Sequence, residues 1–403
     1  MRHYKGFFTG IYVLSFAAIG ALFPLIAQYL HTIGFSGTQI GIVTSSSTAI
    51  GIISNSFWGG VYHKKGRSKK LIVFLSIVTA LLSLFLMLAG QFWIFLALYV
   101  VVFFFENPIY PLVDSTVLEV NYPFGAARKW GAVGFAAGIG VAGLVADRFG
   151  LLSIFPMFAA FFLATALLVW LYAKEQTRLT HDGAAMSNGC CSESKADGDK
   201  YEDDGRASEG CYRELLGNKK YMLLLISAFF YNGPSLSHNT YFGFLYLEVG
   251  GTIAGMGIVL LLMVISEAPV MAFTERIASV LTTERAVLLA MSVSALRFLW
   301  YSTNPSPEMI SATFMLQGIA NGIAIVEIMK YVARLVEPHL LSLAISLFTA
   351  ISLNSGAITC QFFGGVIVEH YGGSGVYLFY GLLNIAGILV YLISALHRPN
   401  MPK

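Results

Sequence analysis

The sequence predicts an all-α membrane protein in which twelve transmembrane helices form two pseudo-symmetric bundles of six. Apolar residues make up 56% of the 403 residues and charged residues only 12%, whereas a soluble domain carries about 25% charged residues. Apolar stretches of about 18 or more residues recur along the chain, and a helix of about 20 residues crosses a bilayer. A polar segment separates the sixth stretch from the seventh, so the helices divide into two sets of six.

The apolar stretches follow one another with short polar breaks. The first six span about residues 7–30, 38–62, 71–90, 92–118, 128–147 and 151–173. The other six span about residues 221–247, 252–274, 286–303, 309–333, 340–368 and 374–396. All are too long for strands of a membrane β-barrel, which have about 10 residues of alternating polarity. The first is long enough to remain as a transmembrane helix, so we expect no cleavable signal peptide.

Residues 174–220 contain ten acidic and eight basic residues and little apolar material. Such a composition cannot bury a core, so we expect a flexible linker between an N-terminal bundle, residues 1–173, and a C-terminal bundle, residues 221–403. With the N-terminus inside, 22 of the 25 Lys and Arg residues fall in cytoplasmic segments. The positive-inside rule therefore predicts cytoplasmic termini, a cytoplasmic linker and a location in the inner (cytoplasmic) membrane.

Two short motifs recur in both halves of the chain. Gly34 and Gly41 have the same spacing as Gly250 and Gly257, and Ile-Val follows the second Gly in each case. Residues 143–150 match residues 365–372, with Gly, an acid and Gly in register. Because the matches fall at equivalent positions of a six-plus-six plan, we infer an internal duplication. Duplicated bundles with a site between them near the midplane are a transporter architecture.

The segment after the second helix reads Gly-Gly-Val-Tyr-His-Lys-Lys-Gly-Arg-Ser-Lys-Lys over residues 59–70. It resembles the signature loop of the major facilitator superfamily. The resemblance implies that Gly59, Gly66 and Arg67 belong to a cytoplasmic gate. His63 stands where the family has an acid, so the lock is expected to be weaker or differently built. On topology alone, the segment is simply a basic cytoplasmic turn.

Two other stretches are Tyr-Pro-Leu-Val-Asp-Ser at 110–115 and Phe-Gly-Ala-Ala-Arg-Lys-Trp-Gly-Ala-Val-Gly-Phe at 124–135. They resemble the branch of the superfamily that contains lactose permease, nucleoside–proton symporters and phenylpropionate permeases. The opening helix and Ser-Glu-Ala-Pro at 266–269 fit the same branch, so the resemblance covers nearly the whole chain outside the linker. It implies the major facilitator fold, two six-helix bundles that work by alternating access.

Helix five and its neighbour contain two features with two interpretations each. Gly131, Gly134 and Gly138 form a small-residue stripe, which allows either tight static packing or a smooth surface on which the bundles rock. Asp114 and Arg128 lie near the cytoplasmic ends of helices four and five. They are close enough for an ion pair, which is either static or broken in one state. We name both as gating candidates.

Ionisable side chains inside apolar segments cost about 2.5–3.5 kcal/mol each, so they are expected to be paired or functional. Glu327 and Lys330 are three residues apart on one helix face and can neutralise each other. Arg297 is then opposed by three acids. Because desolvation disfavours a charged carboxyl, we expect at least one of these acids to bind a proton. The candidate proton-coupling residues are Glu267, Asp114 and Glu106.

In the lactose-permease branch, an acid of helix eight and an arginine of helix nine handle substrate and protons, and Glu267 and Arg297 match them. Gln317 and Ala320 stand where that group has its helix-ten His and acid, so lactose specificity is not implied. His238 is a further candidate because imidazole titrates near neutral pH, although a lone helix His is often only hydrogen-bonded. The candidate substrate-binding residues are Arg297, Glu267, Gln317, His238, Tyr12, Tyr110 and Tyr241.

These residues favour proton-coupled symport of a small polar organic solute, with a sugar or nucleoside ahead of other solutes. Proton-driven efflux of drugs or aromatic acids on the same fold is the alternative, and a non-transporting membrane solute receptor is the alternative of another class. We expect no enzyme, because the sequence contains no HExxH motif and no Gly-rich phosphate loop. We also expect no cofactor, metal or nucleic-acid partner, and a monomer that interacts with its substrate, the proton and the bilayer.

Overall fold

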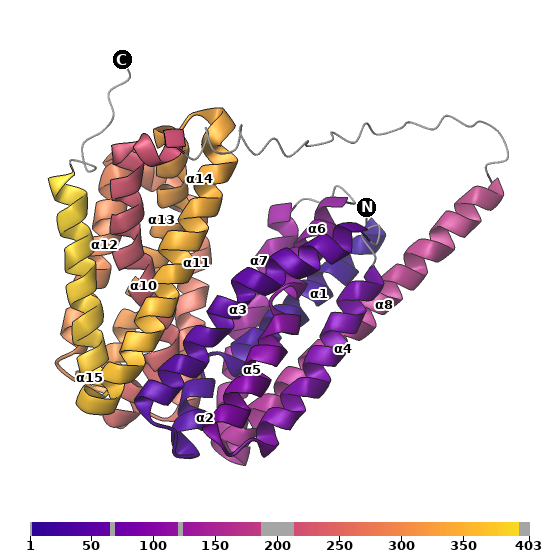
Figure 1. The fold of residues 1–403 in the computed structure, drawn as a ribbon, viewed down its shortest axis with the longest axis horizontal. Helices are drawn as coiled ribbons and strands as arrows, with labels where there is room; N and C mark the ends of the chain where they lie inside the picture. Colours follow the sequence, from indigo (N-terminus) through magenta and orange to yellow (C-terminus); the bar gives the residue numbers. More distant parts are fainter. Residues whose placement is uncertain (1, 65–68, 120–123, 187–212, 395–403) are drawn as a thin grey trace.

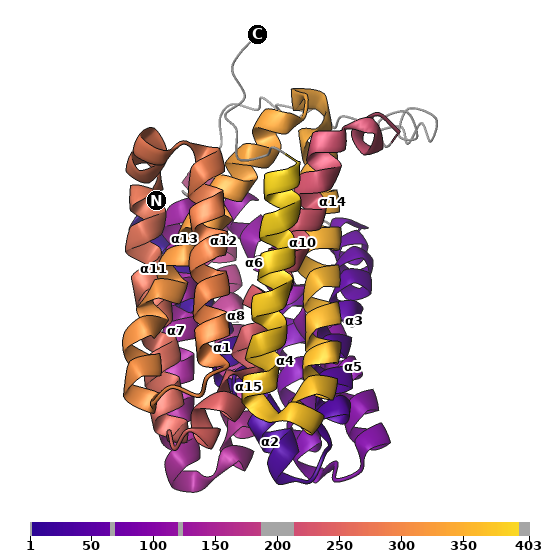
Figure 2. The same cartoon turned by 90° about the vertical axis from the view of Figure 1, so that its left-hand side faces the viewer.

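The computed structural model describes residues 2–64, 69–119, 124–186 and 213–394. Within these ranges every regular element is a helix, and helices occupy all twelve expected stretches. They form two bundles of six that stand side by side (Figures 1 and 2), which confirms the predicted fold class. Gly66 and Arg67, two of the expected gate residues, lie outside the described residues.

Six spans form the N-terminal bundle. In chain order they are α1 (Arg2–Leu22) with α2 (Ile26–Thr32), α3 (Gly37–Lys64), α4 (Lys69–Phe85) with the 3₁₀ turn η1 (Leu86–Leu88), α5 (Phe92–Glu106) with α6 (Ile109–Glu119), α7 (Phe124–Phe149), and the 3₁₀ turn η2 (Leu151–Ser153) with α8 (Ile154–Met186). The last of these helices continues past residue 173, where the sixth apolar stretch was expected to end.

Six further spans form the C-terminal bundle. They are α10 (Lys219–Glu248), α11 (Ile253–Leu281), α12 (Thr283–Tyr301), α13 (Pro307–Leu335), a composite helix and the final span. The composite helix consists of the 3₁₀ turn η3 (Pro338–Leu340), α14 (Leu341–Phe348), the π-helical segment η4 (Thr349–Ser355) and the first part of α15 (Gly356–Ile393). At Gly372, with φ of 67°, α15 bends sharply and becomes the twelfth span.

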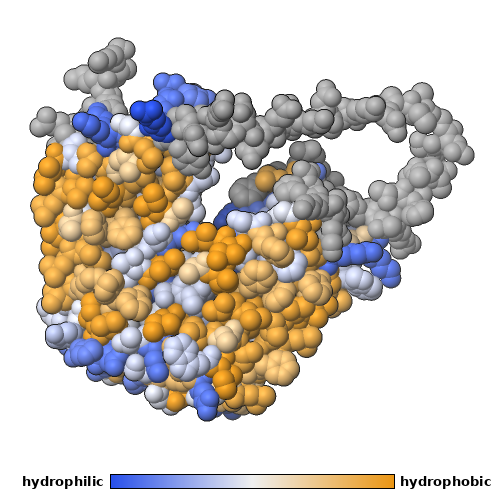
Figure 3. All heavy atoms as spheres, in the orientation of Figure 1, coloured by the Kyte–Doolittle hydropathy of each residue, from blue (hydrophilic) through white to orange (hydrophobic). Residues whose placement is uncertain are grey.

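The outer surface of both bundles is suited to a hydrocarbon environment. Leu88 and Trp93 are 81% and 76% exposed, and Figure 3 shows hydrophobic residues over most of the visible face. Eight helical stretches among the described residues are long and apolar enough to cross a membrane, and one of them contains the last two spans. Helix α11 contributes a shorter apolar stretch, Ile253–Glu267, and α10 and α12 are less apolar because they carry the polar residues described below. The chain is therefore a multi-pass membrane protein.

Three spans contain an interruption. The first breaks at residues 23–25, around Pro24, and the fourth breaks at Asn107 and Pro108. Proline cannot donate a backbone hydrogen bond and its ring crowds the preceding turn, so each break has a local cause. The eleventh span widens into the π-helical segment, a form that is often found at functional sites. The hydropathy pattern gave only the extent of these spans and did not address interruptions within them.

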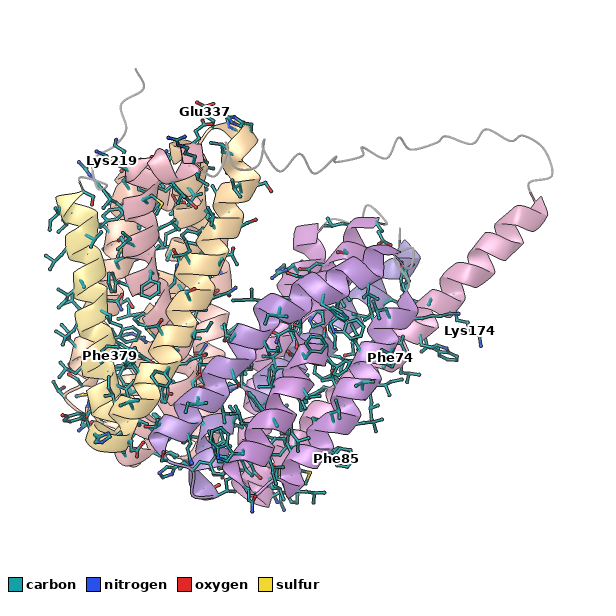
Figure 4. All side chains as sticks on the ribbon, viewed as in Figure 1. Phe74, Phe85, Lys174, Lys219, Glu337 and Phe379 are labelled. Carbon is teal, nitrogen blue, oxygen red and sulfur yellow. The ribbon has the colours of Figure 1, made fainter. Side chains whose placement is uncertain are left out.

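The two bundles contact each other at one end and diverge toward the other (Figure 1). We call the end that contains α2 and Gly372 the closed end. The opposite end, where α1 and α10 begin and α8 finishes, is the open end. Figure 4 places the labelled Lys174, Lys219 and Glu337 at or near the open end. Contacts between the bundles are made mainly by α3 with α15 and by α7 with α11.

Glycines permit both of these close contacts. A Cβ on Gly41 of α3 would lie 3.1 Å from the Cα of Gly365 on α15, and a Cβ on Gly143 of α7 would lie 3.2 Å from the Cα of Gly257 on α11. Both pairs join a residue of one repeated motif to a residue of the other, across the two bundles. The duplicated motifs thus form two equivalent contacts at the closed end, where the backbones approach closely.

One acidic side chain strengthens the α3–α15 contact. The Glu369 carboxylate accepts hydrogen bonds from the backbone N–H of Thr38, at 2.8 Å, and from its hydroxyl, at 2.6 Å. Thr38 is in the first turn of α3, where backbone N–H groups lack helical partners and favour an anion. This bond therefore joins the two bundles at the closed end.

The glycine stripe of the fifth span has a different role. A Cβ on Gly134 or Gly138 would overlap the backbone of Val13 or Ala17 on α1. Because α1 and α7 belong to the same bundle, the stripe serves packing within the N-terminal bundle. The structure therefore supports the packing interpretation of this stripe.

Candidate functional site

Arg297 of α12 is buried in the C-terminal bundle, with only 4% of its surface exposed. Its guanidinium carbon lies 5.1, 4.8 and 5.2 Å from the ring centres of Phe298, Tyr301 and Phe314. One nitrogen, Nη1, is 3.5 Å from the Tyr301 hydroxyl, while Nε and Nη2 have no hydrogen-bond partner among the described residues. Aromatic faces stabilise a buried cation, but they leave its N–H donors available for a ligand.

His238 of α10 is next to Arg297, because both contact Phe298 and Phe314. Its Nδ1 is 2.7 Å from the Tyr377 hydroxyl, and Nε2 has no partner among the described residues. The structure therefore brings together two of the predicted substrate-binding residues. One nitrogen of the imidazole is fixed, which leaves the other as a donor or acceptor for a ligand.

Gln317 of α13 lies one helical turn beyond Phe314, on the same side of the helix. Its side-chain nitrogen donates to Asn321 at 3.1 Å, while its carbonyl oxygen is buried and has no partner among the described residues. We call Arg297, His238 and Gln317 the C-terminal polar cluster. Its unpaired donors and acceptors are costly inside a membrane protein, which favours a functional role.

Sequence reasoning missed part of the polar surface around this cluster. Helix α10 also buries polar atoms with no partner among the described residues, namely the Tyr231 hydroxyl, Asn232 Nδ2, the Ser235 hydroxyl and Asn239 Oδ1. The run of polar residues from 231 to 240, inside an otherwise apolar span, was the signal that would have found them.

Glu267 of α11 is half-buried and forms no hydrogen bond or ion pair with another described residue. It does not pair with Arg297 in this conformation, although the resemblance groups the two. Its backbone is held close to α13, since a Cβ on Gly322 would lie 3.0 Å from the Glu267 carbonyl oxygen. An unpaired carboxyl at this depth is suited to bind and release a proton.

The N-terminal bundle contains a second charged group. Tyr12 of α1 donates to Asp114 of α6 at 2.5 Å, and Arg128 of α7 bonds the other carboxylate oxygen. Tyr12 is buried, whereas Asp114 and Arg128 are 19% and 51% exposed at their side chains. The structure thus forms the ion pair expected from the sequence and adds a tyrosine to it. Its gating role stays a prediction.

Other candidates have local partners. Glu106 is buried at the end of α5 and accepts a hydrogen bond from Tyr110. Tyr241 is buried against α15 and donates to the Gln361 carbonyl at 2.5 Å. Glu327 and Lys330 form the expected pair at 2.9 Å. Gly59 and His63 lie in α3, near its open-end terminus, and the side chain of His63 is outside the described part of the chain.

One cluster has a spacing suited to a metal ion. Among the described residues, Glu214, Glu337 and His339 are the only group of at least three ligand types within mutual reach. All three are exposed, and they already form ion pairs of 3.8 and 3.5 Å with one another. They are a surface ion-pair network of the open end, which carries no argument for a metal.

Comparisons with known proteins agree with this architecture. The profile of the MFS_1 like family matches residues 7–379. A maltose permease of Geobacillus stearothermophilus is 32% identical over 396 residues, which cover 97% of this chain and 94% of that protein. The uncharacterized transporter YwbF of Bacillus subtilis (strain 168) is 28% identical, with 99% and 97% coverage.

Solved structures show the same fold. A crystal structure of the nucleoside transporter NupG superposes with a TM-score of 0.77 at 16% sequence identity, covering 97% of this chain and 98% of that one. A bacterial homologue of the human lysosomal transporter Spinster, in an inward-facing and unoccupied conformation, superposes with a TM-score of 0.71 at 15% identity, covering 98% and 96%.

Proposed function

Because this chain belongs to the MFS_1 like family of major facilitator transporters, we propose that it is a proton-coupled symporter of a small polar organic solute, with a sugar as the first candidate. The relative named a maltose permease covers nearly the whole chain at 32% identity, which supports a sugar. The nucleoside transporter shares the fold, so a nucleoside is the second candidate.

The observation that carries the proposal is the asymmetric contact between the bundles. Glycines join them at the closed end, while they diverge at the open end (Figure 1). Buried polar groups of both bundles lie in the spans between these ends. A carrier needs this arrangement, because its site must face one side of the membrane at a time. Separation of the glycine contacts, with closure of the open end, would expose the same groups to the other side.

The polar groups suggest a division of roles. The C-terminal polar cluster offers a guanidinium, an imidazole and an amide, which suit the hydroxyl and ring oxygens of a sugar. Glu267 lies on the neighbouring helix, has no partner among the described residues, and is the proposed proton carrier. Asp114 and Glu106 are less suited to that role in this conformation, because both already accept hydrogen bonds.

The open end is proposed to face the cytoplasm. The predicted linker begins and ends there, and its ends carry the labelled Lys174 and Lys219 (Figure 4). Lys and Arg residues are concentrated on the cytoplasmic side of bacterial membrane proteins. The conformation is then inward-facing, as in the Spinster homologue of the comparison.

Transport in proteoliposomes tests this proposal. Purified protein is reconstituted, and uptake of radiolabelled maltose, glucose and uridine is measured with and without an inward proton gradient. We expect gradient-driven accumulation of at least one solute. In Glu267→Gln, accumulation should be lost while exchange of internal for external solute continues. Uptake that is indifferent to both the gradient and Glu267→Gln would show that the protein is not a proton symporter.

Drug export is the alternative function, because multidrug resistance proteins MdtG match part of the chain. The match to the protein of Serratia proteamaculans (strain 568) is 29% over 173 residues, 40% of this chain. Everted vesicles that accumulate ethidium under a proton gradient, with none of the three polar solutes transported, would favour export. Binding of a solute without any transport would instead favour a receptor.

A further inference from the structure

A polar pocket lies between the two bundles, and none of its lining residues belongs to the C-terminal polar cluster. Its volume is about 130 Å³, and its polar lining comes from α3, from the break in the fourth span and from η4. A buried water needs only about 10–15 Å³ of such space, so the pocket can accept a larger group. We call it the amide pocket, after the side chains of Asn55, Asn107 and Asn354 that line it.

The amide pocket lies where α3 and the eleventh span begin to diverge. Thr48 of α3 contacts Gln361 of α15 through a 3.3 Å hydrogen bond. Asn55 comes seven residues after Thr48, and Asn354 comes seven residues before Gln361. Because the two helices run in opposite directions, both asparagines lie about two turns, or roughly 10 Å, nearer to the open end. A ligand between them would contact both bundles at once.

All three helix interruptions meet at this pocket. Phe23 of the break in the first span lines it, as do Asn107 of the break in the fourth span and Asn354 of η4. Transporter sites are commonly built from discontinuous helices, and π-helical turns are frequent at functional sites. Three separate spans thus depart from a regular helix at one place, which packing of regular helices does not require.

The lining fits a neutral ligand with hydroxyl groups. Asn55 and Asn354 form no hydrogen bond with another described residue. Asn107 donates to the carbonyls of Ser47 and Phe103, at 3.2 and 2.8 Å, which leaves its own carbonyl oxygen available. None of the described residues that line the pocket has an ionisable side chain. Amides offer donors and acceptors without charge, so they match hydroxyls better than they match ions.

We propose that the amide pocket is a subsite for the hydroxyl groups of a neutral polyhydroxylated solute, bound between Asn354 of one bundle and Asn55 and Asn107 of the other. This deepens the proposed function, on which it rests for the assumption that the bound solute is the transported one. A solute held from both sides favours closure of the open end around it, because closure shortens its contacts to both bundles.

Protection from alkylation tests the subsite without any transport. Ile52 lines the pocket and is exposed, whereas its neighbour Ile53 is exposed but does not line it. Ile52→Cys and Ile53→Cys are made in a background in which Cys190, Cys191 and Cys211 are serine, and N-ethylmaleimide labelling of the purified protein is timed. Maltose at ten times its Kd should slow labelling of Ile52→Cys about tenfold. Labelling of Ile53→Cys should not change.

Asn354→Leu then removes one bundle's contribution. Because a neutral hydrogen bond is lost, the maltose concentration needed for protection should rise about 3- to 10-fold. Uptake by the same proteins is measured separately. Three results would overturn the subsite and leave symport standing. They are uptake of maltose without protection of Ile52→Cys, protection that is unchanged in Asn354→Leu, and equal slowing of labelling by sodium glutamate. Protection without gradient-driven uptake would support the subsite and reject symport, while neither effect would reject both.

Discussion

Widening one glycine contact at the closed end should shift the protein toward the state that is open on the other side. Gly365→Val is the sharpest perturbation. A Cβ at this position would overlap the Gly37 carbonyl oxygen and lie 2.7 Å from the Cα of Gly41. Gly365 belongs to one bundle and Gly37 and Gly41 to the other, so separation of the bundles relieves the overlap without unfolding either one.

The size of the shift follows from the geometry. Carbon atoms in contact prefer about 3.5–4.0 Å, so the helices must move apart by about 1 Å. Overpacking of this kind costs about 1–3 kcal/mol. If that cost falls only on the conformation in which the closed end is packed, the equilibrium between the two states shifts by about 5- to 150-fold.

Distances between spin labels measure this shift. Thr32 and His370 are exposed at the closed end of different bundles, so labels on Thr32→Cys and His370→Cys report on their separation. Double electron–electron resonance on the background without Cys190, Cys191 and Cys211 should show a new, longer distance between the labels in Gly365→Val.

Two valine substitutions serve as matched controls. A Cβ on Gly60 of α3 would meet no atom of the described residues within 4 Å, so Gly60→Val should leave the distance distribution unchanged. A Cβ on Gly138 would overlap Ala17 of the same bundle, so Gly138→Val should lower the melting temperature without adding the longer distance. An unchanged distribution in folded Gly365→Val would refute the assignment of this contact to the closing of that end.

Three other substitutions test single groups. Arg297→Ala should abolish solute binding in calorimetry while the protein is still expressed and folded, because it removes the guanidinium donors that are free for a ligand; wild-type affinity would remove Arg297 from the site. Asp114→Asn should lower the free energy of unfolding by no more than about 1 kcal/mol, since its ion pair is partly exposed, yet abolish uptake. Normal uptake would exclude a gating or coupling role. Glu327→Leu leaves Lys330 without its partner, but the Lys330 side chain is 35% exposed, so the loss of stability should lie below the about 3–5 kcal/mol of a fully buried pair. The double change with Lys330→Leu should recover most of that loss in chemical unfolding; no recovery would show that the pair is not the stabilising unit.

The charge pairs show which contacts local sequence can predict. Glu327 and Lys330 were predicted to pair because residues three apart share a helix face, and they do. Asp114 and Arg128 were predicted to be close because their helices are joined by a short connection, and they form an ion pair. Glu267 and Arg297 lie on different helices without a local constraint, and in this conformation they do not pair.

The amide pocket shows the opposite limit. Asn55, Asn107 and Asn354 are uncharged and stand singly in three distant spans, so no composition or spacing singles them out. The breaks at Pro24 and Pro108 were visible as prolines, but the sequence does not say that they face each other. The π-helical segment contains no Gly or Pro from which it could have been predicted.

By itself the sequence determined that the protein lies in a membrane, how many spans it has and how its two halves are related. Hydropathy and repeated motifs can be read directly along the chain. Only the tertiary structure decided which faces meet. Gly41 packs on Gly365 and Gly143 on Gly257, so each repeated motif contacts the other motif and not its own copy. That choice depends on helix tilt and rotation, which are set by the packing of whole bundles and not by any single segment.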